Sequence, residues 1–454
     1  MTSPSSAIFL REFDKLLPPQ WFAERLPQSG PGSGSGIYSS AVVTWLMITQ
    51  RLHPKGTLQA TMEHFQQHWP TSLLPDCKRV REQNISINPG GYCQARQNMP
   101  TILATQVCDQ VLAKLQERLS GIPANCPHPV YLLDGSSLEL EHVAELVKAY
   151  PPARNQHGQS HWPIMRIAVM HNLANGLALH PAWGPMYGPQ AVSEQALAVD
   201  LMKRLPANAI IVGDRNFGIF STAYDAQHSG HGVVLRLTST RFNKLTGGSG
   251  SIGQDEQIVW SPSRWDRKAH PDLPADAEVR GRVIVAQLKS GTTTELLYLF
   301  TTLDLPAEQI LEIYGYRWYV ETDLRSLKTT IRLEHLTSKS VNMVDKELVM
   351  AITAYNIVRA VMGWASQQAG VEPRTLSFSK VQDAVAAALP ILAAAKTPEE
   401  YAVAFDRMMH HARTYCKLPR RTKPRSFPRM IWPHRNAFPP RKPLPLSPPV
   451  GKTI

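Results

Sequence analysis

The chain has 454 residues, a formal net charge of +12 and 43% hydrophobic residues, enough for about three globular domains. Its five cysteines are an odd number without metal-ligand spacing, which predicts reduced thiols in a cytosolic protein. No segment resembles a signal peptide, and the most apolar stretches are interrupted by Asn, Arg, Tyr or Pro, so we expect no membrane span. The cysteines are Cys77, Cys93, Cys108, Cys126 and Cys416.

The first 125 residues are predicted to be a helical domain. A short helical arm over residues 1–28 is followed by a Gly/Ser-rich flexible linker at residues 29–36. Amphipathic helices are predicted at residues 41–52, 57–69 and 103–119, an arrangement typical of helix-turn-helix readers of the DNA major groove. The alternative is a helical structural cap. Six basic residues favour DNA contact: Arg51, Lys55, Lys78, Arg79, Arg81 and Arg96.

Two aspartates each follow a continuous apolar run. Residues 130–133 precede Asp134, and residues 209–213 precede Asp214. Such runs predict buried strands, and an Asp at the exit of a buried strand stands where α/β folds usually bind ligands. Taken alone, each Asp fits a turn residue or helix cap better than a site residue.

The elements between these aspartates predict a topology. Strand-like segments at residues 164–171 and 177–181 and a helix-like segment at residues 192–205 separate the two. This order, in which three strands are followed by a crossover helix and a fourth strand, is that of a ribonuclease-H-like α/β sheet. Because the first and fourth strands of that fold are neighbours, Asp134 and Asp214 should lie together.

The next segment, residues 237–300, interrupts this pattern. A Gly/Ser loop at residues 247–253 is followed by strand-like residues 257–260, 279–288 and 295–301. We therefore predict an inserted β-subdomain.

Residues 314–328 are predicted to form one α-helix with a charged side and an apolar side. One side carries Tyr314, Arg317, Glu321, Arg325 and Lys328. The stripe beside it consists of Ile313, Val320, Leu324, Leu327 and Ile331, while Glu312 and Asp323 point away. A carboxylate among cations can hold a divalent metal while the cations hold phosphate oxygens. The alternative is an ordinary solvated helix face.

Three carboxylates at one point repel each other unless cations neutralise them. Two Mg²⁺ ions about 3.5–4 Å apart would do so, and such a pair can stabilise both the attacking and the leaving oxygen of a phosphoryl displacement. Asp134, Asp214 and Glu321 are therefore the predicted metal ligands and catalytic residues.

The spacing of Tyr314, Arg317, Glu321 and Lys328 matches at every step the Tyr-Arg-Glu-Lys signature of DDE-type insertion-sequence transposases, the insertion-sequence-four-like group. The sequences Leu-Asp-Gly-Ser around Asp134 and Gly-Asp-Arg-Asn-Phe-Gly around Asp214 also resemble that family. The resemblance covers about residues 125–345. One departure is Asn216, where a glycine is expected.

The resemblance implies a helical N-terminal DNA-binding domain (residues 1–125) and a ribonuclease-H-like catalytic domain (126–345) with a β insertion at about 237–300. A helical C-terminal region (346–410) and a basic, Pro-rich tail (411–454) follow. The tail holds eleven Lys/Arg and no Asp/Glu, which leaves 37 basic against 36 acidic residues elsewhere. It is either an arm that neutralises DNA phosphates or a solubilising tail.

The implied activity is cleavage at terminal inverted repeats and joining of the 3′-OH ends to target DNA. Mg²⁺, replaceable by Mn²⁺, is the expected cofactor, with no small-molecule cofactor. Double-stranded DNA is the expected partner of a cytoplasmic homodimer. Arg317, Lys328, Arg325 and Arg215 would contact DNA, and Tyr314 would bond a phosphate or brace Glu321. Trp260 and Trp265 are the candidates for stacking on a flipped base, and the alternative for each is a core or packing tryptophan. The alternatives are an inactive or domesticated DNA-binding relative and a metal-dependent nuclease without strand transfer.

Overall fold

The computed structural model describes residues 16–25, 36–53, 55–68, 73–74, 78–119, 126, 128–155, 158–290, 293–334, 336–395 and 397–418. The predicted linker at residues 29–36 lies outside them except for Gly36, as do Cys77 and most of the basic tail. The remaining cysteines, Cys93, Cys108, Cys126 and Cys416, are free thiols, as predicted.

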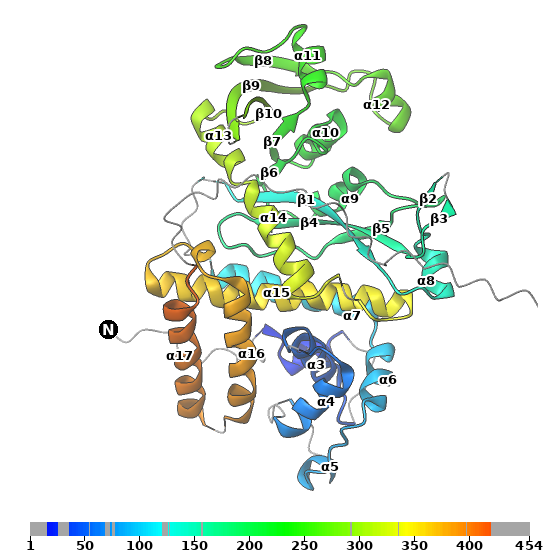
Figure 1. Ribbon diagram of the computed structural model, residues 1–454, viewed down its shortest axis with the longest axis vertical. Coiled ribbons are helices and arrows are strands. Elements are labelled where there is room, and N and C mark those ends of the chain that lie inside the picture. The colour runs from blue at the N-terminus through cyan, green and yellow to red at the C-terminus, as the bar shows by residue number, and fades with distance from the viewer. Residues whose placement is uncertain are drawn as a thin grey trace, which may run out of the picture.

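An eight-stranded sheet runs through the middle and upper parts of the protein (Figure 1). In sheet order its strands are β5 (Ala182–Pro185), β4 (Ile164–Asn172), β1 (Val130–Glu139), β6 (Ile210–Gly213), β7 (Gly232–Leu237), β10 (Thr293–Thr301), β9 (Val279–Ser290) and β8 (Asp255–Trp260). A separate ribbon pairs β2 (Arg154–Asn155) with β3 (Gly158–Gln159). The fold is mixed α/β.

Strand β1 is antiparallel to β4 and parallel to β6, and β7 is in turn parallel to β6. The crossover from β5 to β6 contains α9 (Glu194–Met202), and α10 (Phe220–His228) connects β6 to β7. The strand that carries Asp134 therefore lies directly beside the strand that ends before Asp214. The predicted adjacency of these two strands is confirmed.

Two predicted strand limits were wrong. Strand β1 does not end before Asp134 but continues to Glu139, because residues 134–139 pair with β4. The third strand lies at Ala182–Pro185 rather than at residues 177–181, of which only Ala178 forms an isolated bridge with His171. In both cases pairing with β4 sets the limits, which a local apolar pattern does not reveal.

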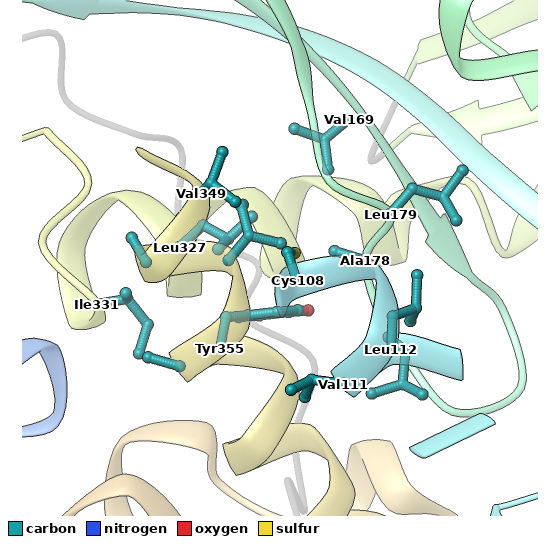
Figure 2. Packing of buried hydrophobic residues seen from close by; sticks show 14 of the residues in the cluster. Cys108, Val111, Leu112, Val169, Ala178, Leu179, Leu327, Ile331, Val349 and Tyr355 are labelled. Atoms are coloured by element: carbon teal, nitrogen blue, oxygen red, sulfur yellow. The ribbon is translucent and has the colours of Figure 1, made fainter. Parts of the chain in front are cut away.

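Alternate side chains of β1 enter two different cores, as the two-residue period of a strand requires. Tyr131 and Leu133 belong to a large core, whereas Val130 and Leu132 belong to a smaller one. The large core is continuous with the helices below the sheet, and Figure 2 shows part of it.

Residues 237–300 extend this sheet rather than forming a sheet of their own. Strand β10 pairs antiparallel with β7, and β9 and β8 follow outward. Helices α11 (Ser239–Thr246) and α12 (Arg264–Ala269) flank these strands at the upper end of Figure 1. A capping box between Ser263 and Asp266 begins α12. The predicted strands are present, and their description as an inserted subdomain remains a prediction.

The N-terminal part is helical, as predicted. Its helices are α2 (Pro19–Ala23), α3 (Ser40–Leu52), α4 (Leu58–Gln67), α5 (Lys78–Arg81), α6 (Gly90–Asn98) and α7 (Thr101–Arg118), and α8 (Ala144–Ala149) follows β1. The side chains of Ser39 and Thr57 cap α3 and α4 by accepting backbone hydrogen bonds.

Two of the basic residues expected on DNA are instead buried. Arg51 and Arg96 both pair with Glu347, at 3.2 and 3.4 Å, and all three side chains are at most 10% exposed. Because Arg51 lies on α3, Arg96 on α6 and Glu347 on α15 (Val341–Ala369), these ion pairs connect the first two helices to the third. The expectation that Arg51 and Arg96 contact DNA was therefore wrong, because a carboxylate distant in sequence neutralises them. Lys55, Lys78, Arg79 and Arg81 remain exposed.

The C-terminal part consists of α15, α16 (Phe378–Ala394) and α17 (Pro398–Tyr415), with a 3-10 turn η2 (Pro373–Thr375) between the first two. Helix α17 extends past residue 411, where the tail was predicted to begin, and Lys417 bridges to Leu376. By length and composition, α15 is the one helix among the described residues that could cross a membrane. Of its most apolar window, 94% is buried in this protein, as in the central helix of a globular core.

Candidate active site

Asp134 and Asp214 occupy equivalent positions on neighbouring parallel strands. The last parallel pair of β1 and β6 joins Leu133 to Gly213, and each aspartate is the next residue. Neighbouring strands lie about 4.8 Å apart, so the two residues come side by side. Asp134 is itself within β1, opposite Val169 of β4.

The carboxyl group of Asp134 lies in an environment that disfavours its charge. Burial, together with the nearby charges of Asp214 and Glu194, raises its pKa to about 6. The Gly135 N–H, which donates to Oδ1 at 2.8 Å, and Arg317 oppose this rise. A net excess of negative charge at this point would be relieved by a bound cation.

The predicted signature helix is broken into three pieces. Helix α13 (Ala307–Gly315) ends at the glycine of the signature, α14 (Trp318–Arg325) starts after Arg317, and a π-helical turn η1 (Ser326–Thr330) continues it. A single regular helix was therefore wrong. The break follows Gly315, a residue that weakens helices.

The apolar stripe of this segment is nevertheless buried as predicted. Ile313 and Val320 belong to the smaller core, which they share with residues of β1 and β6, whereas Leu324, Leu327 and Ile331 belong to the large core. Helix α14 packs on β1 (Figure 1). The stripe therefore packs the helix that carries Glu321 against β1, the strand of Asp134.

Glu321 is paired with Arg317, four residues earlier. The Arg317 Nη2 group donates to Glu321 Oε1 at 2.6 Å, and the Glu321 side chain is 42% exposed. Burial alone would lower the pKa of Arg317, but the hydrogen bond to Glu321 and the charges of Tyr314, Glu321 and Asp134 raise it. The Arg317 guanidinium therefore interacts favourably with the charges of both Glu321 and Asp134.

The other signature residues occupy different depths. Lys328 Nζ lies 3.5 Å from the backbone oxygen of Ser137, so it reaches β1 three residues beyond Asp134. Tyr314 is buried, and burial raises its pKa against the opposing charges of Arg317 and Arg236. Arg325 and Arg215 are exposed.

Within the part of the chain that the structure describes, no three His, Cys, Asp or Glu side chains are grouped closely enough to hold a metal ion as they stand. Asp134 and Asp214 are brought together, but Glu321 is turned toward Arg317. The donor set itself consists of carboxylate oxygens, which are the ligands that Mg²⁺ and Mn²⁺ prefer. The donor set therefore fits a divalent cation chemically, while Glu321 contacts Arg317 in this structure.

The prediction of site residues missed a carboxylate, an amide and a guanidinium. Glu194 lies beside Gly135 and accepts a hydrogen bond from Asn216, which in turn donates its backbone N–H to Asp214 Oδ1 at 2.8 Å. Arg236 of β7 lies near Tyr314. The only sequence signal was Asn216 itself, which departs from the glycine of the family pattern.

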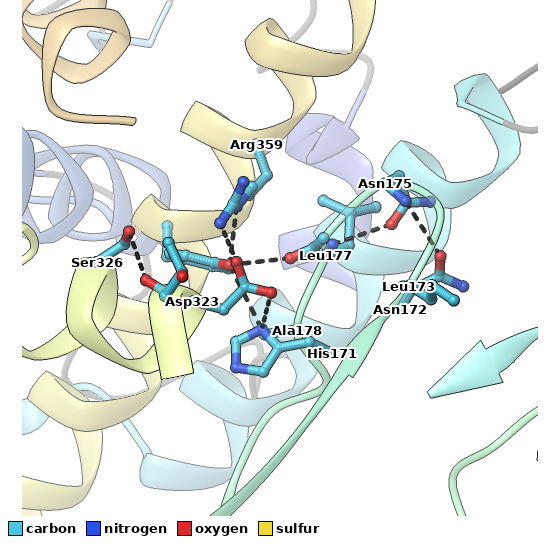
Figure 3. Close-up of polar contacts among 12 residues, drawn as sticks. His171, Asn172, Leu173, Asn175, Leu177, Ala178, Asp323, Ser326 and Arg359 are labelled. Atoms are coloured by element: carbon cyan, nitrogen blue, oxygen red, sulfur yellow. Dashed lines mark hydrogen bonds and ion pairs between the residues drawn. The ribbon is translucent and has the colours of Figure 1, made fainter. Parts of the chain in front are cut away.

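Asp323, two residues after Glu321, belongs to a separate cluster shown in Figure 3. It accepts hydrogen bonds from Arg359 and, at 2.7 and 2.8 Å, from Arg374 Nη1, and His171 lies 3.9 Å away. Burial would raise its pKa, but the two arginines and His171 hold it below the usual range. We call Asp323, Arg359, Arg374 and His171 the sealed cluster.

The two candidate base-stacking tryptophans differ in exposure. Trp260 is 6% exposed and packs edge-on against Phe220 and Phe300, which agrees with the alternative of a core tryptophan. Trp265 is 62% exposed, and its ring is flanked by Arg264 and Lys268. Of the two candidates, Trp265 is therefore the exposed one.

A family model described as "Transposase DDE domain" matches residues 125–357. The chain is 24% identical over 355 residues to transposase InsG of insertion sequence element IS4 from Escherichia coli strain K12, and the match covers 76% of each chain. Among solved structures, a cryo-EM structure of the piggyBac transposase synaptic complex with hairpin DNA matches with a TM-score of 0.43 and 13% identity. That match covers 88% of this chain and 84% of the other.

Proposed function

The chain belongs to the transposase DDE domain family, and we propose that it cleaves DNA at the terminal inverted repeats of an insertion sequence and joins the 3′-OH ends to target DNA. The observation that carries this proposal is the placement of Asp134 and Asp214 directly after the last residue pair that joins β1 to β6, with α14 packed against β1. The strand order around β1 supports a ribonuclease-H-like catalytic fold.

Asp134, Asp214 and Glu321 would hold Mg²⁺, or Mn²⁺ in its place. When bound, the cations would polarise the scissile phosphate and lower the pKa of an attacking water or 3′-OH. To bind the cation, the Glu321 carboxylate would leave Arg317 and turn toward Asp134 and Asp214. The Arg317 guanidinium would then contact a phosphate oxygen. The raised pKa of Asp134 is caused first by burial and then by the charges of Asp214 and Glu194, and a bound cation would favour the ionised form of this carboxyl group.

The basic residues around the carboxylates would position DNA. Lys328 lies along β1 beyond Asp134, and Arg215 directly follows Asp214, so both border the aspartate pair. Arg325 is exposed at the end of α14. Tyr314 is too buried to contact DNA directly and would brace Arg317, to which it is electrostatically coupled. Trp265 would stack on a base flipped from the duplex.

The partner would be double-stranded DNA, at the element ends and at the target, and the protein would act in the cytoplasm. We further propose that it works as a homodimer, because a transposase must hold two ends together. The exposed basic residues of α5 and the basic tail would supply phosphate contacts that are independent of sequence.

The test is a cleavage and joining assay with the full chain, Mg²⁺, a donor plasmid carrying the inverted repeats that flank its gene, and a target plasmid. Donor cleavage together with covalent joining of the 3′ ends to the target supports transposition. Cleavage without joining identifies the nuclease alternative. Binding of the ends without cleavage identifies a non-catalytic relative, and either result contradicts the proposal.

A further inference from the structure

Arg236 lies in the same row of the sheet as the two aspartates. Strand β6 pairs in parallel with β1 on one side and with β7 on the other, and the last residue pairs on the two sides form one line. The next residues along the three strands are Asp134, Asp214 and Arg236. Because neighbouring strands lie about 4.8 Å apart, an arginine follows directly beside the aspartate pair.

The side chain of Arg236 leaves the sheet on the same face as that of Asp134. Side chains two residues apart on a strand share a face. Val234, two residues before Arg236, and Leu132, two residues before Asp134, both belong to the smaller core. The positive charge of Arg236 is therefore presented on the side of the sheet that carries the proposed site.

The signature residues cover this face of the sheet. Helix α13 packs on β7 (Figure 1), and Tyr314 near its end belongs to the smaller core. Burial is the main cause that raises the pKa of Tyr314. The charges of Arg317 and Arg236 oppose this rise, and that of Asp214 adds to it. Arg236 therefore interacts with the same groups as the arginine of the signature.

The alternative is a structural role for Arg236 through an ion pair. Its Nη2 atom lies 3.8 Å from Oε2 of Glu295 on β10, which is beyond hydrogen-bond distance, and the Glu295 side chain is 63% exposed. Exposed pairs of this kind contribute little to stability. Arg282 on β9 provides a contrast, because it lies 3.1 Å from Asp255 and donates a hydrogen bond to it. The Glu295 contact therefore does not account for an arginine at position 236.

We infer that Arg236 binds a DNA phosphate next to the scissile one, on the β7 side of the aspartate pair. This inference rests on the proposed function. A planar guanidinium presents paired N–H donors that match two phosphate oxygens. Arg236 is one strand away from Asp214 and two from Asp134, so it is displaced from the centre of the pair toward the neighbouring phosphate. Lys328 contacts β1 and Arg236 lies on β7, so the two cations flank the aspartates.

The test uses duplexes of the inverted-repeat end in which one phosphate at a time near the cleavage site is a neutral methylphosphonate. Binding to the full chain is measured by fluorescence anisotropy. Arg236→Ala should bind the unmodified end about tenfold or more weakly, through loss of one charge-assisted contact. One methylphosphonate should weaken wild-type binding to the same degree and Arg236→Ala no further, since both changes remove one interaction. Arg236→Lys should keep part of the affinity, because it retains the charge without the planar donors.

Two control variants separate this role from a structural one. Glu295→Gln removes the carboxylate beside Arg236 but keeps the guanidinium, so it should bind the end at least as tightly as the wild type. Arg413→Ala removes an arginine of α17 that donates to Gln368 at 3.1 Å, and it should leave the affinity unchanged. The melting temperatures of all these variants should equal that of the wild type.

Full affinity of Arg236→Ala for the end would overturn this inference, as would an equal loss of affinity in Glu295→Gln. The same conclusion would follow if every methylphosphonate weakened binding of Arg236→Ala as much as that of the wild type. In these cases, cleavage and joining by the wild type would leave the proposed function intact. A wild-type protein that bound the end no better than random duplex and cleaved neither would contradict the proposed function itself.

Discussion

Glu321 and Asp323 are two residues apart on α14, yet they lie in opposite environments. A helix turns about 100° per residue, so these side chains leave its axis about 200° apart. The Glu321 side chain is 42% exposed and contacts one cation, Arg317. The Asp323 side chain is 0% exposed and contacts Arg359 and Arg374. The first contacts Arg317 near the surface, and the second lies within the sealed cluster.

The charges that surround a buried carboxylate indicate whether it has a structural or a chemical role, as a comparison of Asp134 with Asp323 shows. Burial disfavours the charge at both Asp134 and Asp323. At Asp323 two arginines outweigh burial and lower the pKa, so the charge is already compensated within the fold. At Asp134 the neighbouring carboxylates add to burial and raise the pKa to about 6. Of these two sites, the one at Asp134 has negative charge that the fold leaves uncompensated.

The largest expected effect is on chemistry at the open site. Asp134→Asn or Asp214→Asn should lower the rate of DNA cleavage by about a thousandfold, because each removes a ligand of the ion that stabilises the transition state. Neither should lower the melting temperature, since each removes a charge that the fold does not compensate. Plasmid nicking and thermal unfolding measure the two effects, and more than a tenth of wild-type nicking by either variant would contradict the assignment.

The converse is expected at the sealed cluster. Asp323→Asn leaves Arg359 and Arg374 buried without a counter-charge, so we expect the free energy of unfolding to fall by about 3–5 kcal/mol. Urea denaturation checks this, with Asp200→Asn as the surface control. A variant that unfolded at the wild-type urea concentration would show that the cluster is not a structural centre.

A smaller effect should appear when pH is lowered. Burial is the main cause that lowers the pKa of His171 to about 4, from 6.5 in the unfolded chain. Between those values the unfolded chain binds a proton that the folded chain does not, so stability falls as pH decreases from about 6.5 to about 4. The loss from this group should reach about 3 kcal/mol.

Urea denaturation at several pH values measures this dependence. His171→Gln should flatten it in that window, whereas the exposed His128→Gln should not. An equally steep dependence in His171→Gln would assign the effect to other groups.

The smallest effect is expected at Lys328. Its Nζ lies along β1 near Ser137, so Lys328→Ala should slow strand transfer by about tenfold through loss of one charge-assisted contact to phosphate. Lys328→Arg should restore part of the rate, because the planar guanidinium differs in shape from a compact ammonium. The control is the exposed Lys339→Ala. Unchanged strand transfer in Lys328→Ala would make this residue a packing element.

Some of this arrangement could be predicted from sequence because it depends on the order of elements. Two apolar runs, each followed by an Asp, with two strands and a helix between them, were sufficient to place Asp134 beside Asp214. The apolar stripe that orients Glu321 was also visible, since helical periodicity survives the break after Gly315.

The rest depends on partners that are distant in sequence. Arg51 and Arg96 resemble DNA contacts until Glu347 is placed between them. Asp323 could be assigned to the face opposite Glu321, but its neutralisation by Arg359 and Arg374 follows only from tertiary packing. Glu194 resembles an ordinary first-turn glutamate, and its contacts with Gly135 and Asn216 follow only from tertiary packing.

The most direct test of the central claim is Mg²⁺-dependent cleavage of the donor plasmid by Glu321→Gln. The matched control is Glu312→Gln, whose exposed carboxylate on α13 accepts a hydrogen bond from Tyr316 at 2.8 Å. If Glu321 leaves Arg317 to join Asp134 and Asp214, Glu321→Gln should cleave at about a hundredth of the wild-type rate or less, with an unchanged melting temperature. Glu312→Gln should cleave normally. Cleavage by Glu321→Gln above a tenth of the wild-type rate would contradict the claim that these three carboxylates form one centre.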